Sequence, residues 1–285
     1  MKLLVEYSKK RDNYKNIDGI ILSLKDYSVQ SIEYYSLEEI KDIIDKNKSL
    51  EIFIKINKNI FNNEISKLKE ILLEIDKLNI KGIFFYDLSL IKLKEDLKLK
   101  TDLIWDQTHM VNNYMTCDYY YSKGVKYALL GKEITLEEII EIINKSKIIS
   151  MVEVVSRPSV AYSKRKLLTN YYHSIKKDKK SSLEVIEKGT NTNYIIIESN
   201  NGTSFYIKDI TNGTSVIKEL YDNNCKYIIM REFGIEKFDE LVNDTKKYID
   251  NKCIDKEYIN KYKRLGDNTN FFFKKTIYMV KKNEK

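Results

Sequence analysis

Short apolar, β-branched runs alternate with amphipathic stretches along most of this chain, and this alternation constrains the fold more than any other feature. Continuous apolar strands joined by helices are typical of a parallel sheet covered on both faces. Eight such units within 285 residues predict an α/β fold, a single (β/α)8 TIM-like barrel domain over residues 1–285. The expected strands are residues 3–6, 19–23, 51–56, 82–86, 102–105, 126–130, 149–155 and 226–230.

Between the strands, apolar residues recur at the three- and four-residue spacing of amphipathic helices. Ser36 and Thr135 each precede such a stretch and are followed three residues later by a glutamate, which is the pattern of a capping box. Tyr119, Tyr120 and Tyr121 are expected to be buried or to lie on an edge strand. The expected helices are residues 37–46, 64–78, 88–93, the stretch after Thr135, 164–174, 215–221 and 235–249.

About 70 residues separate the seventh and eighth expected strands, far more than an ordinary connection requires. Two strand-like segments, 194–199 and 204–209, flank Asn200-Asn201-Gly202, which is a strong β-hairpin pattern. We therefore expect a hairpin-containing insertion, about residues 157–225, at the C-terminal mouth of the barrel, where loops carry function. Residues 251–285 are expected to form a C-terminal extension.

Seven charged residues and one asparagine lie where the expected strands end, and in this type of barrel those positions hold the active residues. Carboxylates there can serve acid–base chemistry, and arginine binds a carboxylate through two parallel hydrogen bonds. The mouth could therefore bind an anionic small molecule, or its charges could only form salt bridges that fix the rim. The residues are Glu6, Asn57, Asp87, Asp106, Glu153, Arg157, Arg231 and Glu232.

A concentrated basic segment lies within the expected insertion. Together with a net charge of +8, it permits an acidic partner such as RNA without requiring one. Tyrosines at 162, 171 and 172 lie among these charges, and basic groups interleaved with aromatic ones suit a nucleic-acid backbone and exposed bases. An exposed helix start and a lysine-rich turn account for the segment equally well. The basic residues are Lys164, Arg165, Lys166, Lys176, Lys177, Lys179 and Lys180.

Aromatic runs offer a second possible contact with bases. The tyrosines at 119–121 and the phenylalanines at 271–273 could stack on nucleobases. Burial or a place on an edge strand is the competing interpretation for both runs, and we favour it.

Cysteine and histidine patterns argue against a disulfide framework and a metal site. Cys117, Cys225 and Cys253 lie far apart, and the two histidines, His109 and His173, lack the spacing of metal ligands. No apolar run approaches the ~20 residues of a membrane span, and the N-terminus does not resemble a signal peptide. We expect a soluble cytoplasmic protein with no metal and no membrane association.

The segment 151–171 resembles the signature region of the U32 peptidase family, in which a glutamate at a strand end leads through a Tyr-Ser-x-Arg-like turn into a helix. The resemblance implies that Glu153 and Glu232 orient arginines or move protons. It also implies a ligand site formed by Arg157, Arg165, Arg231, Asp106 and Asn112. Further blocks resemble the family in the same order, at residues 105–113, 124–135, 205–209, 230–234 and 271–280.

The chain departs from many family members at residue 166, and this difference bears on whether it binds an iron–sulfur cluster. Family members with an iron–sulfur cluster place a cysteine where Lys166 stands, and cluster ligation needs thiolates. A cluster bound through cysteine is therefore not expected here. The chain is most similar to short, cysteine-poor members, which implies a role in 5-hydroxylation of the wobble uridine of tRNA, with prephenate or a similar anionic metabolite.

The resemblance leaves three functions open. The protein could catalyse the tRNA hydroxylation or act as the partner of a longer, cysteine-containing paralogue. It could be a collagenase-like peptidase, although the sequence offers no recognisable catalytic set for one. It could also be a binding subunit without catalytic activity.

Overall fold

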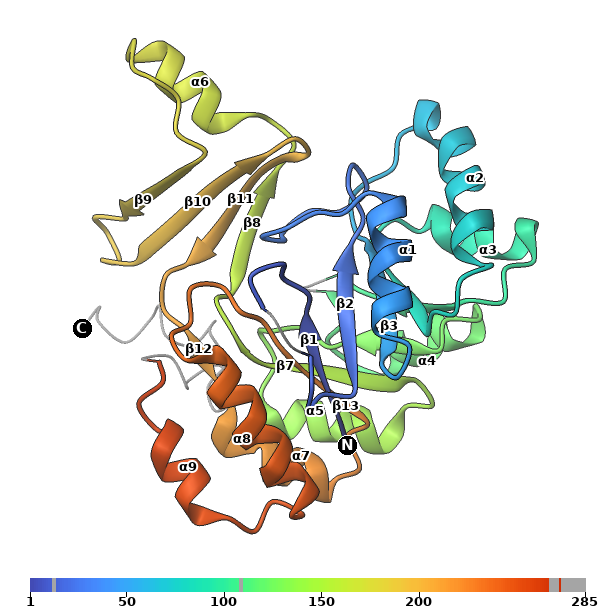
Figure 1. Cartoon of the computed structure of the whole chain (residues 1–285), viewed down its shortest axis with the longest axis vertical. Coiled ribbons are helices and arrows are strands. Elements are labelled where there is room, and N and C mark those ends of the chain that lie inside the picture. Colours follow the sequence, from blue (N-terminus) through green and yellow to red (C-terminus); the bar gives the residue numbers. More distant parts are fainter. Residues whose placement is uncertain (12–13, 108–109, 267–271, 273–285) are drawn as a thin grey trace.

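Eight parallel strands form a closed barrel in the computed structural model, which describes residues 1–11, 14–107, 110–266 and 272 (Figure 1). β1 to β6 follow one another in space, β7 pairs with β6, and β13 pairs with both β7 and β1. The predicted (β/α)8 TIM-like barrel is confirmed. The barrel strands are β1 Lys2–Glu6, β2 Gly19–Ser23, β3 Glu51–Ile56, β4 Gly82–Phe85, β5 Asp102–Trp105, β6 Tyr127–Leu129, β7 Ile149–Ser156 and β13 Tyr227–Met230.

Helices surround the barrel and bury their apolar faces against the outward side chains of the strands. Both predicted capping boxes are present, at Ser36 before α1 and at Thr135 before α5. No helix lies between β1 and β2 among the described residues, so the first unit of the barrel is incomplete. The helices are α1 Leu37–Lys46, η1 Asn62–Glu64, α2 Ile65–Ile75, α3 Ser89–Leu97, α4 Tyr114–Ser122, α5 Leu136–Lys145, η3 Thr214–Val216, α7 Ile217–Asp222, α8 Phe238–Asp250 and α9 Lys256–Tyr262.

The inside of the barrel is filled by a separate apolar cluster to which every barrel strand contributes. Because side chains alternate between the two faces of a strand, these residues are two apart wherever one strand supplies a pair. Aromatic rings pack edge to face within the cluster, with ring centroids 6.0 Å apart for Phe53 and Tyr227 and for Tyr127 and Tyr227. The members are Leu4, Ile21, Phe53, Phe84, Ile104, Tyr127, Leu129, Met151, Tyr227 and Ile229.

The long segment between β7 and β13 contains a second, antiparallel sheet, which confirms the predicted hairpin-containing insertion. Its strands are ordered β8-β11-β10-β9, and Ser199 pairs with Gly202 across the predicted Asn200-Asn201 turn. Figure 1 shows this sheet and α6 standing to one side of the barrel. The elements are β8 Ser159–Ser163, α6 Leu167–Ser174, β9 Ser182–Ile186, β10 Asn193–Ser199, β11 Gly202–Ile207 and β12 Thr211–Asn212, which pairs with β7.

Two local predictions are wrong. Tyr119 and Tyr121 are exposed and lie on α4, not on an edge strand, because Asn113 caps that helix. Tyr120 is buried, as expected, and stacks on Trp105 at a centroid distance of 3.8 Å. Lys164, Arg165 and Lys166 precede α6 instead of forming its first turn. Of the aromatic run at 271–273, only Phe272 lies within the described residues, and it is buried.

Among the described residues, no helix combines the length and the apolar character that crossing a membrane would require.

Candidate functional site

A layer of polar side chains lies above the apolar interior, at the C-terminal ends of the strands. The inward-facing pattern continues by two residues on β1, β3 and β7, from Leu4 to Glu6, from Phe53 to Lys55 and from Met151 to Glu153. By the same alternation, Asp106 follows Ile104 and Arg231 follows Ile229. The fold therefore brings these five charged groups to one end of the barrel.

The charged groups form a continuous chain of ion pairs. Lys55 Nζ lies 3.3 Å from Glu6 Oε1, and Arg231 Nη1 lies 3.6 Å from Glu6 Oε2. Arg231 Nε lies 2.5 Å from Glu153 Oε2, and Lys132 pairs with the other oxygen of Glu153. The members of this chain are Lys55, Glu6, Arg231, Glu153 and Lys132; with all of them ionised, three cations face two carboxylates, which leaves one uncompensated positive charge.

The pKa values follow from this arrangement. Burial alone would raise the pKa of Glu153, but the charges of Arg231 and Lys132 outweigh it and lower the pKa to about 2. Burial likewise opposes ionisation of Glu6, yet Lys55 and Arg231 hold its pKa below the usual value. Burial lowers the pKa of Lys55, although the negative charge of Glu6 opposes this shift. Both glutamates are therefore carboxylates at neutral pH.

Asp106 differs from the two glutamates in its ionisation. It is 6% exposed and receives a long hydrogen bond of 3.4 Å from Asn57 Nδ2. Burial raises the pKa of Asp106, and the positive charges of Lys55, Arg231 and Lys132 offset only part of this effect. Asp106 therefore keeps its proton to a higher pH than a free aspartate does, and in the protonated form its carboxyl group both donates and accepts hydrogen bonds.

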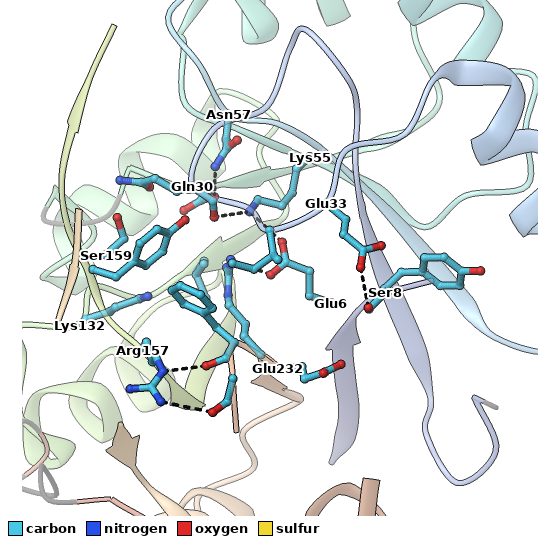
Figure 2. Close-up of a pocket in the computed structure, with 18 of the residues that line it drawn as sticks. Glu6, Ser8, Gln30, Glu33, Lys55, Asn57, Lys132, Arg157, Ser159 and Glu232 are labelled. Atoms are coloured by element: carbon cyan, nitrogen blue, oxygen red, sulfur yellow. Dashed lines mark hydrogen bonds and ion pairs between the residues drawn. The ribbon is translucent and has the colours of Figure 1, made fainter. Parts of the chain in front are cut away.

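A cavity of about 280 Å³ lies over this charged layer. Figure 2 shows its lining side chains, with Lys55 and Glu6 pointing toward one another and Asn57 above them. The inserted sheet supplies part of the wall through Ser159 on β8 and Tyr206 on β11. Tyr206 is 5% exposed and packs edge to face on Phe233. The insertion thus covers part of the mouth of the barrel.

Of the three remaining charged residues predicted at the rim, Arg157 and Glu232 line the cavity, whereas Asp87 does not and instead accepts hydrogen bonds from the backbone N–H groups of Ile60 and Ser89. Arg157 Nε donates to the carbonyl oxygen of Phe233 at 2.7 Å, and Nη2 donates to that of Gly234 at 3.3 Å, so this guanidinium holds the loop after β13 (Figure 2). Glu232 is half-buried, and burial together with the negative charge of Asp239 raises its pKa. Figure 2 shows Glu232 apart from the ion-pair chain.

The other predicted site residues lie elsewhere. Asn112, in the loop before α4, and Arg165, in the turn before α6, do not line this cavity. The predicted RNA-binding lysines are exposed on the insertion. Of these, Lys164 lies 3.0 Å from the ring centre of Phe61, and Lys179 pairs with Glu198 at 3.0 Å. The other exposed lysines are Lys166, Lys176, Lys177 and Lys180.

Lys55, Lys132 and Tyr206 are among the residues of the cavity wall that sequence analysis did not identify. Lys55 could have been noticed in the sequence, because it is a single lysine within the apolar strand Glu51–Ile56, at the inward-facing position two residues after Phe53. Lys132 follows β6 in a loop, and Tyr206 lies on a strand of the insertion. Their approach to the cavity depends on the tertiary arrangement.

The cysteines take no part in this site. All three are buried, and burial raises the pKa values of Cys117 and Cys225 to about 12 and that of Cys253 to about 11. A thiol with such a pKa supplies little thiolate at neutral pH, and the thiolate is both the nucleophile and the metal ligand. Within the described ranges, no group of three or more His, Cys, Asp or Glu side chains is arranged to hold a metal ion.

The fold and the site together define an α/β-barrel protein with a charged, partly covered mouth. The model of peptidase family U32 matches residues 13–201, and the chain belongs to that family. A tRNA hydroxylation protein P2 of Bacillus subtilis (strain 168) is 22% identical over 148 residues, which are 51% of this chain and 48% of the relative. The match thus spans about half the length of that relative.

Solved structures with a similar arrangement include two enzymes. One is the 3-hexulose-6-phosphate synthase from Salmonella typhimurium, at 9% identity and a TM-score of 0.49 over 90% of this chain and 100% of that one. The other is a chitinase from Rhizomucor miehei, at 9% identity and a TM-score of 0.45 over 87% and 99%. Likeness at this level carries no information on function.

Proposed function

We propose that this protein takes part in 5-hydroxylation of the wobble uridine of tRNA, and that its barrel mouth binds prephenate or a similar anionic metabolite for that reaction. The observation that carries the proposal is the charge of the ion-pair chain, in which Lys55, Lys132 and Arg231 exceed Glu6 and Glu153 by one positive charge. A partly enclosed cavity of about 280 Å³ with this excess suits a small anion. The matched tRNA hydroxylation protein supports the choice of reaction.

In this proposal the residues of the mouth bind and orient the metabolite. Arg231 and Lys132 offer charge-assisted hydrogen bonds to a carboxylate, while Glu153 fixes the orientation of both cations. Glu232, with its raised pKa, is available to move a proton at the open side of the cavity. The exposed lysines of the insertion would hold RNA phosphates.

The decisive experiment is nucleoside mass spectrometry of tRNA from a strain that lacks the gene. We expect 5-hydroxyuridine and nucleosides derived from it to fall, and to be restored by the wild-type chain but not by Arg231→Met. Calorimetry with prephenate should show binding to the wild-type protein that falls at least tenfold in the variant. Unchanged tRNA nucleosides in the deletion strain would overturn the proposal.

Two further measurements distinguish a partner of a paralogue, a non-catalytic subunit and a peptidase. Purification of the tagged protein from its own cells should recover a cysteine-containing paralogue if the protein acts as a partner. Recovery of neither paralogue nor tRNA would count against both the tRNA role and a non-catalytic subunit. If the purified protein cleaves a peptide panel and Glu153→Gln abolishes that cleavage, the protein is a peptidase and the proposal is wrong.

A further inference from the structure

A second cavity of about 360 Å³ lies beside the first, and the two share part of their walls. The shared residues are Gln30, Asn57, Asp106 and Ser159. The remaining wall of the second cavity is less charged than that of the first and includes Tyr86, after β4, together with Tyr162 and Val160 on β8. Two adjoining compartments of different chemistry suggest two different ligands.

Aromatic side chains on two separate elements face the second compartment. Tyr86 comes from the barrel and Tyr162 from the inserted sheet, and both are half-buried. The hydroxyl group of Tyr162 donates to the carbonyl oxygen of Asn201, which fixes the position of its ring. Aromatic and apolar surfaces of this kind bind nucleobases by stacking.

The shared wall supplies hydrogen-bonding groups that suit the edge of a pyrimidine. Asp106 lines both cavities, and its protonated form, which burial favours by raising the pKa, presents an O–H donor beside a carbonyl acceptor. This pair complements the adjacent N–H and carbonyl groups of a ring imide. Asn57 is fixed by the backbone N–H of Val29, which donates to Oδ1 at 3.0 Å. Gln30 adopts a left-handed backbone with φ of 55°, a costly conformation for a non-glycine residue that is concentrated at functional sites.

Lysines lie where a sugar-phosphate backbone would approach this compartment. Lys58 lines the cavity and pairs with Glu64 at 2.5 Å. Lys164 lies over Phe61, three residues beyond Lys58, so the chain after β8 meets the chain after β3 there. Glu64 neutralises part of this charge, and Lys164 adds to it.

We propose that the second cavity holds a pyrimidine base turned out of an RNA loop, with its hydrogen-bonding edge on Asp106 and its ring against Tyr86 and Tyr162. The inference rests on the proposed function and assigns the base and the anion to separate compartments. In uracil, C4 and C5 are adjacent ring atoms, so a 4-oxo group bound by Asp106 would place C5 beside the shared wall. Taking a base out of its stack is the ordinary solution when a protein must reach a ring atom.

Two variants test the second cavity with little risk to the fold. Tyr86→Ala removes one ring, and Val160→Trp fills the cavity from a side chain that is 46% exposed. Ile186→Trp, at a 64% exposed position on β9 of the same sheet, is the matched control. Affinity is measured by fluorescence anisotropy for two anticodon stem-loop RNAs, one with uridine at the wobble position and one abasic there.

We expect Tyr86→Ala and Val160→Trp to weaken binding of the uridine-containing RNA about tenfold, the size of one lost base stack. Binding of the abasic RNA and of prephenate should be unchanged, and Ile186→Trp should resemble the wild type. Equal effects on both RNAs, or no effect on either, would overturn the inference.

Complementation of the deletion strain separates failure of this inference from failure of the proposed function. If Tyr86→Ala and Val160→Trp both restore wild-type 5-hydroxyuridine, the base does not bind in this cavity, while the proposed function stands. If deletion leaves tRNA nucleosides unchanged, the proposed function and the inference fail together.

Discussion

Arg231 Nε lies 2.5 Å from Glu153 Oε2, between the neighbouring strands β13 and β7 and inside the mouth of the barrel. The Glu153 side chain is 1% exposed and that of Arg231 is 15% exposed, so both charges are largely removed from water. Lys132 and Ser156 also contact Glu153, and Glu6 also contacts Arg231. This pair therefore links Glu6 and Lys55 on one side to Lys132 on the other, and the loss of either partner interrupts the chain of ion pairs.

Removal of the arginine should destabilise the protein. Arg231→Met leaves Glu153 buried with Lys132 as its remaining cation, and breaking a buried pair in this way costs about 3–5 kcal/mol. Urea unfolding at pH 7 measures the change. The double variant Arg231→Met with Glu153→Gln should recover a large part of the loss, because the buried charge that has lost Arg231 is then removed as well. Equal stability of wild type and Arg231→Met would contradict the buried pair.

Stability should fall at acidic pH through Glu153. Its pKa in the folded state, about 2, lies below the ordinary value of 4.5, so ionised Glu153 stabilises the fold above pH 4.5. That contribution, about 3 kcal/mol from the pKa difference, is lost as the pH falls from about 4.5 toward 2. The difference in unfolding free energy between wild type and Glu153→Gln should therefore shrink between pH 5 and pH 3. A constant difference would show that Glu153 does not titrate as described.

Anion binding should depend on the lysine after β6 and not on the lysine before it. Lys132 lies after β6 at the cavity and pairs with Glu153, whereas Lys126 precedes the same strand and pairs with Asp102 at 3.1 Å. We expect Lys132→Gln to weaken prephenate binding about tenfold, about 1.4 kcal/mol, and Lys126→Gln to have no effect. Isothermal titration calorimetry measures both. If both variants lose affinity equally, the effect comes from net charge and the mouth is not the site.

The thiols should be unreactive in the folded protein. Cys117, Cys225 and Cys253 are buried with raised pKa values, so both access and thiolate formation are limited. At pH 8, a disulfide reagent such as dithionitrobenzoate should label them only as fast as the protein unfolds, and urea should expose all three at once. Rapid labelling of one thiol without denaturant would mean that its surroundings open locally.

The barrel strands could be predicted from the sequence to within about one residue. β2, β3 and β5 match their expected bounds because each is an apolar run closed by polar residues, and burial on both faces produces that pattern. α4 could not be predicted in this way. Its three consecutive tyrosines favour a strand by propensity, and the helix depends on the Asn113 cap and on contact with Trp105.

The insertion was predicted less completely. Its hairpin has a local turn signal, but β8 and β9 are short strands with half-exposed side chains, and they form through pairing with β11 and β10. For the same reason, Tyr206 could not be placed in the cavity from sequence. Arg157 was predicted as a ligand-binding arginine, and its contacts with two backbone carbonyls could not be foreseen because they join residues 76 and 77 positions apart.

The apolar cluster inside the barrel determines how a small molecule can enter and leave the cavity. Phe53, Tyr127 and Tyr227 fill the interior below the charged layer, and all three are buried. A close-packed interior of this kind leaves no passage for a small molecule. Any molecule that reaches Arg231 must therefore enter and leave at the same end of the barrel, where Ser159 and Tyr206 of the inserted sheet form part of the wall.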